Sequence, residues 1–525
     1  MQTETLLPPM PGGSAAPVAP DTPAPPRGSA TLLDKIPLSA AVVLLLGCGD
    51  GSLGAAFRRR NPRSRVIGIE ANPHLARRAS TVLDEVYCLA PEPGPLPPLP
   101  PVDCIVLAVG LVAALARPVD LLAELARLLA PGGIVVVCAP PGPPEAQHQL
   151  LLAAGLHALD AEEMHLAPYA DSAETPIVWR TTTSAVAPLR IMSSMLPAVG
   201  GVSQVRVVEP LHALASEPAV TASVVHRPEA VPDTQGAPSI FILHRPALLG
   251  ANGLATVRDL IALGWLVVCE FDDHPSQIPI LYRSDVHNFD AVHAIQTSTP
   301  VLAEVLAREN PEVAVFPNAL HHLPEPANFT DPSRLTVLFA ALNREEDWPG
   351  HMEALNEAAA NAGDALHFQV IADQAFFDAL ATPHKTFTPL CDYATYLDIL
   401  SRCEVSFMPL RDTLFNRCKS DLKFLEAAAH RAVALASPTV YAASIRDGEN
   451  GLLFTNPQEL RERLMHLATR REATRAMAET ARREVAGDRM LAYQMHARTR
   501  WYRSLWSRRE ALHAALLARV PALAG

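Results

Sequence analysis

The sequence predicts an α/β protein built from three Rossmann-like, doubly wound parallel sheets. From residue 40 onward, short apolar runs typical of buried strands alternate with segments of helical periodicity. Many of these runs end in polar residues or glycine-rich loops, which is where open α/β sheets hold their ligands. The chain has 525 residues. At roughly 100–200 residues per domain, that length allows two to four domains.

Composition excludes several classes of protein. The formal net charge is −12, so a nucleic acid is not expected as a partner. No apolar run approaches the ~18 residues of a membrane span. No basic and apolar leader marks the chain for export, so we expect a cytoplasmic protein. The eight cysteines show no C-x-x-C spacing, which favours buried free thiols over disulfides or a metal site.

The first 30 residues are rich in Pro, Ala and Gly and have almost no aliphatic periodicity. We expect a disordered leader, because such a segment cannot bury enough surface to offset its chain entropy.

Residues 31–170 are expected to form the first folded domain. An apolar run at 42–46 is followed at once by Gly47, Gly49 and Gly51, and a second run ends in Glu70. Such a loop lets the backbone approach a ligand, and an acid at the end of the second strand reaches ribose hydroxyls.

Together with the later Pro-Gly-Gly turn and the segment GIEANP, this pattern resembles class I S-adenosylmethionine-dependent methyltransferases over about residues 40–170. The resemblance implies S-adenosyl-L-methionine as cofactor, held by Gly47, Gly49, Gly51 and Glu70. The sequence departs from the family pattern at Leu45, where an acid is usual, and in the apolar segment 109–114. Two readings stay open, an active methyltransferase and a scaffold domain.

Residues 155–190 are expected to form a linker or a final strand pair, and the domain boundary is placed in a linker at 171–187. Residues 188–330 are expected to form a second Rossmann-like domain. Its first strand leads into Gly200 and Gly201, which could bring backbone N–H groups to an anionic ligand or form an ordinary tight turn. Asp273 follows a later strand and has three readings: acceptor binding or a structural role, catalytic base, and metal ligand, in that order of preference. No metal requirement is expected. The predicted strands are 189–193, 239–243, 266–270, 291–296 and 313–316.

Residues 331–485 are expected to form the third domain. Its key stretch runs from 416 to 454, where Lys419, Lys423 and Glu426 are spaced to share one face of a helix. Lysines beside a strand end suit phosphate, and a carboxylate one turn on suits ribose hydroxyls. A solvated amphipathic helix is the alternative. The other predicted elements are strands 336–340, 368–372, 405–410 and 432–436 and helix 393–401.

The stretch 416–454, with its Lys, its Glu and the turn Asp-Gly-Glu-Asn-Gly, resembles the donor segment of group 1 (family 4-like) glycosyltransferases of GT-B fold. The segments Thr-Ser-Thr-Pro at 297–300 and Pro-Asn at 317–318 extend the resemblance over about residues 188–505. It implies a nucleotide-sugar donor and a glycan or lipid-linked acceptor. The implied site residues are Lys419, Lys423, Arg344 and Asp273 for catalysis, and Glu426, Gly200, Gly201 and Asn450 for donor binding.

The family's retaining members carry two glutamates spaced E-x7-E, and the first of these falls at Cys418. Retention or inversion therefore stays open, as do three functions. The first is a glycosyltransferase with a methyltransferase-like domain of open activity. The second is a bifunctional enzyme of surface polysaccharide, and the third is a non-catalytic binding protein.

Residues 486–525 are expected to be C-terminal helices, within an Arg-rich region that contains Trp501, Tyr502 and Trp506. One reading is the helix pair that GT-B proteins fold back across both domains. The other is peripheral contact with the inner face of an anionic membrane.

Overall fold

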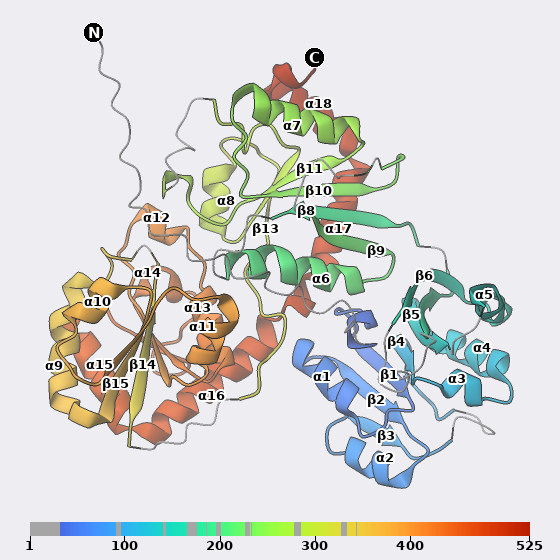
Figure 1. Cartoon of the computed structure of the whole chain (residues 1–525), viewed down its shortest axis with the longest axis horizontal. Coiled ribbons are helices and arrows are strands. Elements are labelled where there is room, and N and C mark those ends of the chain that lie inside the picture. The colour runs from blue at the N-terminus through green and yellow to red at the C-terminus, as the bar shows by residue number, and fades with distance from the viewer. Residues whose placement is uncertain are drawn as a thin grey trace, which may run out of the picture.

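A computed structural model describes residues 32–524 apart from 91–95, 140–142, 165–175, 185, 196–200, 226–231, 233, 278–284, 327–332 and 343. The described strands form one seven-stranded and two six-stranded sheets, which confirms the predicted fold class of three mainly parallel Rossmann-like sheets (Figure 1). We call the parts of the chain that carry these sheets the first, second and third units. The predicted leader, residues 1–30, lies outside the described residues.

The first unit contains η1 (Leu32–Lys35), β1 (Val42–Leu46), α1 (Ser52–Arg60), β2 (Arg65–Ile69), α2 (Pro73–Ala79), β3 (Glu85–Tyr87), β4 (Val102–Leu107), α3 (Leu111–Ala114), α4 (Pro118–Leu128), β5 (Leu129–Ala139), α5 (Pro144–Ala153), β6 (His157–Glu163) and β7 (Ile177–Thr182). The strand order is β3-β2-β1-β4-β5-β7-β6, and β7 runs antiparallel to both neighbours. Of the two interpretations of residues 155–190, the structure confirms the final strand pair, β6 and β7. The linker placed at 171–187 is wrong for β7, because this buried strand is hydrogen-bonded between β5 and β6.

The second unit contains β8 (Leu189–Ser194), the π-helical turn η3 (Gln204–Val208), α6 (Glu209–Ser216), β9 (Val220–Val225), β10 (Ser239–His244), α7 (Gly250–Ala262), β11 (Leu266–Glu270), η5 (Pro275–Gln277), β12 (Ala294–Thr297), α8 (Pro300–Leu306) and β13 (Val313–Val315). All of its strand pairs are parallel, in the order β13-β12-β11-β10-β8-β9. The order reverses direction beside β8, so the loop after β8 lies at a topological switch point, where α/β sheets bind ligands.

The third unit contains β14 (Leu335–Ala340), η7 (Pro349–His351), α9 (Met352–Ala362), η8 (Gly363–Ala365), β15 (Leu366–Ile371), α10 (Gln374–Ala379), β16 (Lys385–Thr388), α11 (Tyr393–Leu400), β17 (Val405–Met408), α12 (Leu414–Arg417), α13 (Leu422–Ala429), β18 (Val433–Ala436), α14 (Pro438–Tyr441), β19 (Leu452–Leu453), α15 (Pro457–Thr469) and α16 (Arg471–Asp488). The strand order β16-β15-β14-β17-β18-β19 is entirely parallel and reverses between β14 and β17. This second switch point lies at the end of β14.

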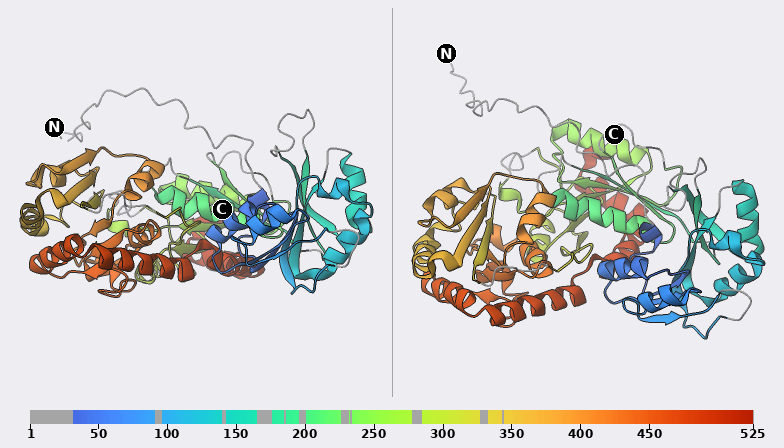
Figure 2. Two further views of the ribbon diagram at one scale, coloured as in Figure 1. Left: turned by 90° about the horizontal axis from the view of Figure 1, so that it is seen from below. Right: turned by 60° about the horizontal axis from the view of Figure 1, so that its bottom comes forward.

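After α16 the chain returns to the second unit through η9 (Leu491–Gln494), α17 (Met495–Ser507), α18 (Arg509–Arg519) and η10 (Pro521–Ala524). Figure 2 shows the chain passing from the third unit along α16, in orange-red, to these helices, in red, against the second unit. α17 buries Tyr502 in the core of the second unit, and Trp501 packs against Phe316. The aromatic side chains that suggested contact with a membrane thus pack within the protein. None of the helices among the described residues combines the length and the apolar character needed to cross a bilayer.

Candidate active site

A cavity of about 240 Å³ opens between the second and third units, at the switch points of both sheets. The ends of β14 and β15 form one wall, and α11 and α13 form another. The second unit contributes the residues that follow β8. The lining residues are Gly201, Val202, Ala340, Ala341, Leu342, Arg344, Ile371, Ala372, Leu390, Cys391, Asp392, Tyr393, Tyr396, Leu422, Lys423 and Glu426.

The predicted single helix through Lys419, Lys423 and Glu426 is wrong, because the chain breaks between α12 and α13. Tertiary hydrogen bonds hold the break. Ser420 accepts from the side chain of Asn318 at 2.7 Å, and the carboxylate of Asp421 accepts two hydrogen bonds from Arg489 at 2.7 and 2.8 Å. Lys419 therefore lies in the connecting turn, whereas Lys423 and Glu426 share α13.

The side chain of Lys423 extends from α13 to the end of β14, where its Nζ donates a hydrogen bond to the carbonyl of Ala340. Burial, with the nearby charge of Arg344 as the next cause, lowers the pKa of Lys423 to about 8. An anionic ligand in the cavity would stabilise the charged ammonium, so this lysine is suited to a phosphate.

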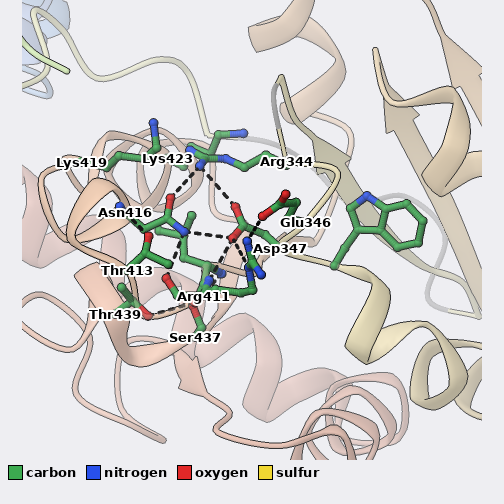
Figure 3. Close-up of polar contacts among 12 residues, drawn as sticks. Arg344, Glu346, Asp347, Arg411, Thr413, Asn416, Lys419, Lys423, Ser437 and Thr439 are labelled. Carbon is green, nitrogen blue, oxygen red and sulfur yellow. Dashed lines mark hydrogen bonds and ion pairs between the residues drawn. The ribbon is translucent and has the colours of Figure 1, made fainter. Parts of the chain in front are cut away.

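Arg344 is held in place by the amide of Asn416, at 3.2 Å, and by Asp347, at 3.4 Å. The Oδ1 atom of Asp347 in turn accepts from the side chain of Asn416 at 2.9 Å and from the backbone N–H of Arg411 at 3.0 Å. Figure 3 shows Arg344, Lys419 and Lys423 together on one side of this network. Asp347 and Asn416 were not predicted as site residues from the sequence, because their pairing joins loops that are far apart in the chain.

Glu426 lines the cavity and is almost completely buried, with 3% of its surface exposed. Its Oε1 accepts from the hydroxyl of Tyr393 at 2.7 Å, and its Oε2 accepts from that of Tyr396 at 2.8 Å. Burial raises the pKa of Glu426, and the two phenols and Lys423 oppose that shift. The tyrosines were also missed, although their spacing on the predicted helix 393–401 was a usable signal.

The glycine pair is described only in part, because Gly200 lies outside the described residues. Gly201 lines the cavity in direct contact with the third unit. A Cβ at Gly201 would lie 2.6 Å from the ring of Tyr393. A side chain at position 201 would therefore push the two units apart or displace the tyrosine.

Lys419 and Asp273 face each other from the third and second units, with Nζ and Oδ1 3.4 Å apart. Lys419 also lies over the ring of Phe415, 4.0 Å from its centroid. Neither residue is among those that line the cavity. Within the described residues, no three His, Cys, Asp or Glu side chains form a group that could hold a metal ion.

One predicted feature of the donor segment, the place of Asn450 in the cavity, needs correction. Asn450 does not line the cavity, because its amide is used within its own turn and by α16. It accepts from the N–H of Arg446 at 2.7 Å and donates to Glu484 at 2.6 Å. Cys418, at the position of the missing acid, is a buried thiol whose pKa burial raises to about 11. It supplies no carboxylate.

In the first unit, Gly47, Gly49 and Gly51 all have positive φ, between 59° and 84°, which favours glycine. The N–H of Gly49 donates to Glu70 Oε2 at 2.9 Å, so the loop and the carboxylate lie together as predicted. Leu45 is buried in the core. This arrangement offers a nucleoside a backbone cradle and a carboxylate, and at Leu45 it offers no acid for the amino group of S-adenosylmethionine. The glycine loop and Glu70 therefore fit the nucleoside half of that cofactor.

In a comparison with protein families, residues 44–135 match the model of a methyltransferase domain. Similar curated proteins include trans-aconitate 2-methyltransferases of Azoarcus sp. (strain BH72), 33% identical over 24% of this chain and 49% of that protein, and of Methylobacterium nodulans, 31% identical over 30% of this chain and 66% of that protein. The chain thus spans about half to two thirds of the length of these relatives. The match confirms the resemblance stated for the N-terminal part of the chain.

Comparison with solved structures finds similar chains at low sequence identity. HepE from Anabaena, in complex with UDP and glucose, is 12% identical with a TM-score of 0.44, over 60% of this chain and all of that chain. S. aureus TarM is 11% identical with a TM-score of 0.36, over 48% of this chain and 58% of that chain. A TehB-like SAM-dependent methyltransferase from Corynebacterium glutamicum is 19% identical with a TM-score of 0.23, over 27% and 80%.

Proposed function

We propose that the second and third units form a glycosyltransferase that moves a sugar from a nucleotide-sugar donor to a glycan or lipid-linked acceptor. One observation carries the proposal. Two cations, Arg344 and Lys423, line an inter-unit cavity together with the buried carboxylate of Glu426. A nucleoside diphosphate presents the complementary groups, namely two phosphates and a ribose diol.

In this reaction the bond between the anomeric carbon and the diphosphate oxygen breaks, and a bond to an acceptor hydroxyl oxygen forms. The hydroxyl proton leaves to a base, for which Asp273 is our candidate. The departing diphosphate carries the developing negative charge, so the largest catalytic contribution comes from cations fixed near it. Lys423 and Arg344 fill that role, with Lys419 close to both, and Glu426 holds the ribose.

For the first unit we propose binding of S-adenosylmethionine through Glu70 and the glycine loop, which the match to a methyltransferase domain favours. When bound, that cofactor supplies an electrophilic methyl group. The alternative is a scaffold domain without turnover. A bifunctional enzyme and a glycosyltransferase with an inactive first unit differ only in whether the first unit transfers a methyl group.

A screen of UDP-, GDP- and ADP-linked hexoses for release of nucleoside diphosphate tests the glycosyltransferase proposal. We expect release from one nucleotide class by the full chain, and loss of release in Lys423→Ala. Lys385→Ala is the matched control, since Lys385 also donates to backbone carbonyls but belongs to β16, away from the cavity. Release from no donor, or equal release by wild type and Lys423→Ala, would reject the proposal.

A further inference from the structure

We propose that Tyr393 and Tyr396 are positioning residues that fix Glu426 for recognition of the vicinal ribose diol of a ribonucleotide. The inference rests on the proposed function of the cavity and adds two residues and a specificity to it. It starts from the two phenol hydroxyls that both donate to one carboxylate.

The two tyrosines lie one helical turn apart on α11, with ring centroids 6.0 Å apart and nearly parallel planes. Each donates to a different oxygen of Glu426, at 2.7 and 2.8 Å. Two fixed hydrogen bonds at different oxygens set both the position and the rotation of the carboxylate. Burial raises the pKa of both phenols far above its usual range, so both remain donors at any physiological pH.

The number of free acceptor sites on the carboxylate then limits which ligands it can bind. An ionised carboxylate has about four lone-pair sites, two on each oxygen. The phenols occupy one on each oxygen, so one on each oxygen remains. Two adjacent hydroxyl donors match this remainder, and a ribose offers them at its 2′ and 3′ positions. A 2′-deoxyribose leaves one acceptor of a buried carboxylate unpaired, which costs free energy.

Tyr393 also connects the carboxylate to the second unit. Its ring lies where a Cβ of Gly201 would come within 2.6 Å, and Gly201 follows β8. The same side chain therefore contacts the glycine loop of one unit and orients the carboxylate of the other.

Calorimetry with UDP, GDP and ADP, and with the 2′-deoxy form of each, tests the inference on the full chain. The wild type should bind one ribonucleotide about tenfold or more tightly than its 2′-deoxy form, the loss expected for one hydrogen bond to a charged group. Tyr393→Phe and Tyr396→Phe should each weaken the ribonucleotide more than the deoxy form, so that the ratio falls severalfold. A structural effect alone would weaken both ligands equally.

Tyr502→Phe is the matched control, because it also removes a buried phenol hydrogen bond, to Gln296 at 2.7 Å, in the core of the second unit. Its ribo-to-deoxy ratio should equal that of the wild type. Ribonucleotide binding with an unchanged ratio in both tyrosine variants would overturn the inference and leave the proposed function standing. If the wild type binds none of the three nucleoside diphosphates, the proposed function fails, and the inference fails with it.

Discussion

The backbone N–H of Leu323 donates to the carbonyl of Arg59 at 2.8 Å and so joins the first unit to the segment that connects the second and third units. The ion pair between Arg59 and Glu325, at 2.9 Å, reinforces this contact. The chain passes between the second and third units a second time after α16, and we call the two passages the crossings. Arg63 lies at this second crossing, where it pairs with Asp488 at 2.9 Å. The first unit therefore contacts both places where the chain passes between the two units that form the cavity.

Arg63→Ala should loosen the contact at the second crossing. Besides the pair with Asp488, the guanidinium lies over the ring of Tyr493, 4.2 Å from its centroid. An exposed cation–π contact and a surface ion pair each contribute up to about 1 kcal/mol. We expect faster amide hydrogen exchange over residues 488–494. Arg58→Ala is the control, because Arg58 pairs with Asp84 inside the first unit. Equal exchange in the two variants would contradict this docking.

Lys423→Ala should lower glycosyl transfer by about 10²-fold or more, a typical loss when one preorganised electrostatic contact to developing charge is removed. The measurement is the steady-state release of nucleoside diphosphate, with circular dichroism to check that the variant is folded. A folded variant that keeps wild-type turnover would show that Lys423 does not act on the leaving group.

Nucleotide affinity should also depend on pH through Lys423. Because burial and Arg344 lower its pKa to about 8, its charge is present below about pH 8 and is lost as the pH rises further. The dissociation constant should therefore increase about fivefold from pH 8 to 9 and approach about tenfold per pH unit above that, the limit for the loss of one bound proton. Lys423→Arg keeps its charge in this range and should show a flatter profile. The same slope in both proteins would assign the effect to another group.

The sequence was sufficient to predict the three sheets because each central strand is a short apolar run that ends at a polar or glycine-rich loop. It also placed Lys423 and Glu426 correctly on one helix. It failed for Lys419 and Asn450, whose positions depend on hydrogen bonds to distant residues, such as the pair of Asp421 with Arg489. Helical spacing alone contains no information on such contacts.

Stability should fall as the pH rises through the titration range of Glu209. Burial, with the nearby charge of Glu426 as a further contribution, raises the pKa of the Glu209 carboxyl from 4.5 to about 7. Between these values the unfolded chain has lost the proton and the folded chain still holds it, so the free energy of unfolding decreases with pH. Thermal unfolding of wild type and Glu209→Gln from pH 4.5 to 8 checks this. The melting temperature of the variant relative to that of the wild type should rise up to about pH 7 and then level off. A constant difference would place the titration of Glu209 outside this range.

The first unit should bind S-adenosylmethionine weakly and through Glu70. The carboxylate already accepts from the N–H groups of Gly49 and Asn72, both at 2.9 Å, so it is correctly placed beside the glycine loop. Leu45 offers the methionine end no acid, and the loss of one hydrogen bond to a charged group costs about 1.5–3 kcal/mol, or roughly ten- to a hundredfold in affinity.

Calorimetry should use the full chain, because β7, beyond residue 170, belongs to the same sheet. Glu70→Gln should weaken binding by a further tenfold or more, whereas Glu85→Gln, a change at the exposed carboxylate of β3, should not. Tight binding that survives Glu70→Gln would mean that the cofactor lies elsewhere. No binding by the wild type would favour the scaffold reading, in which the first unit contributes its contacts to the two crossings and no chemistry.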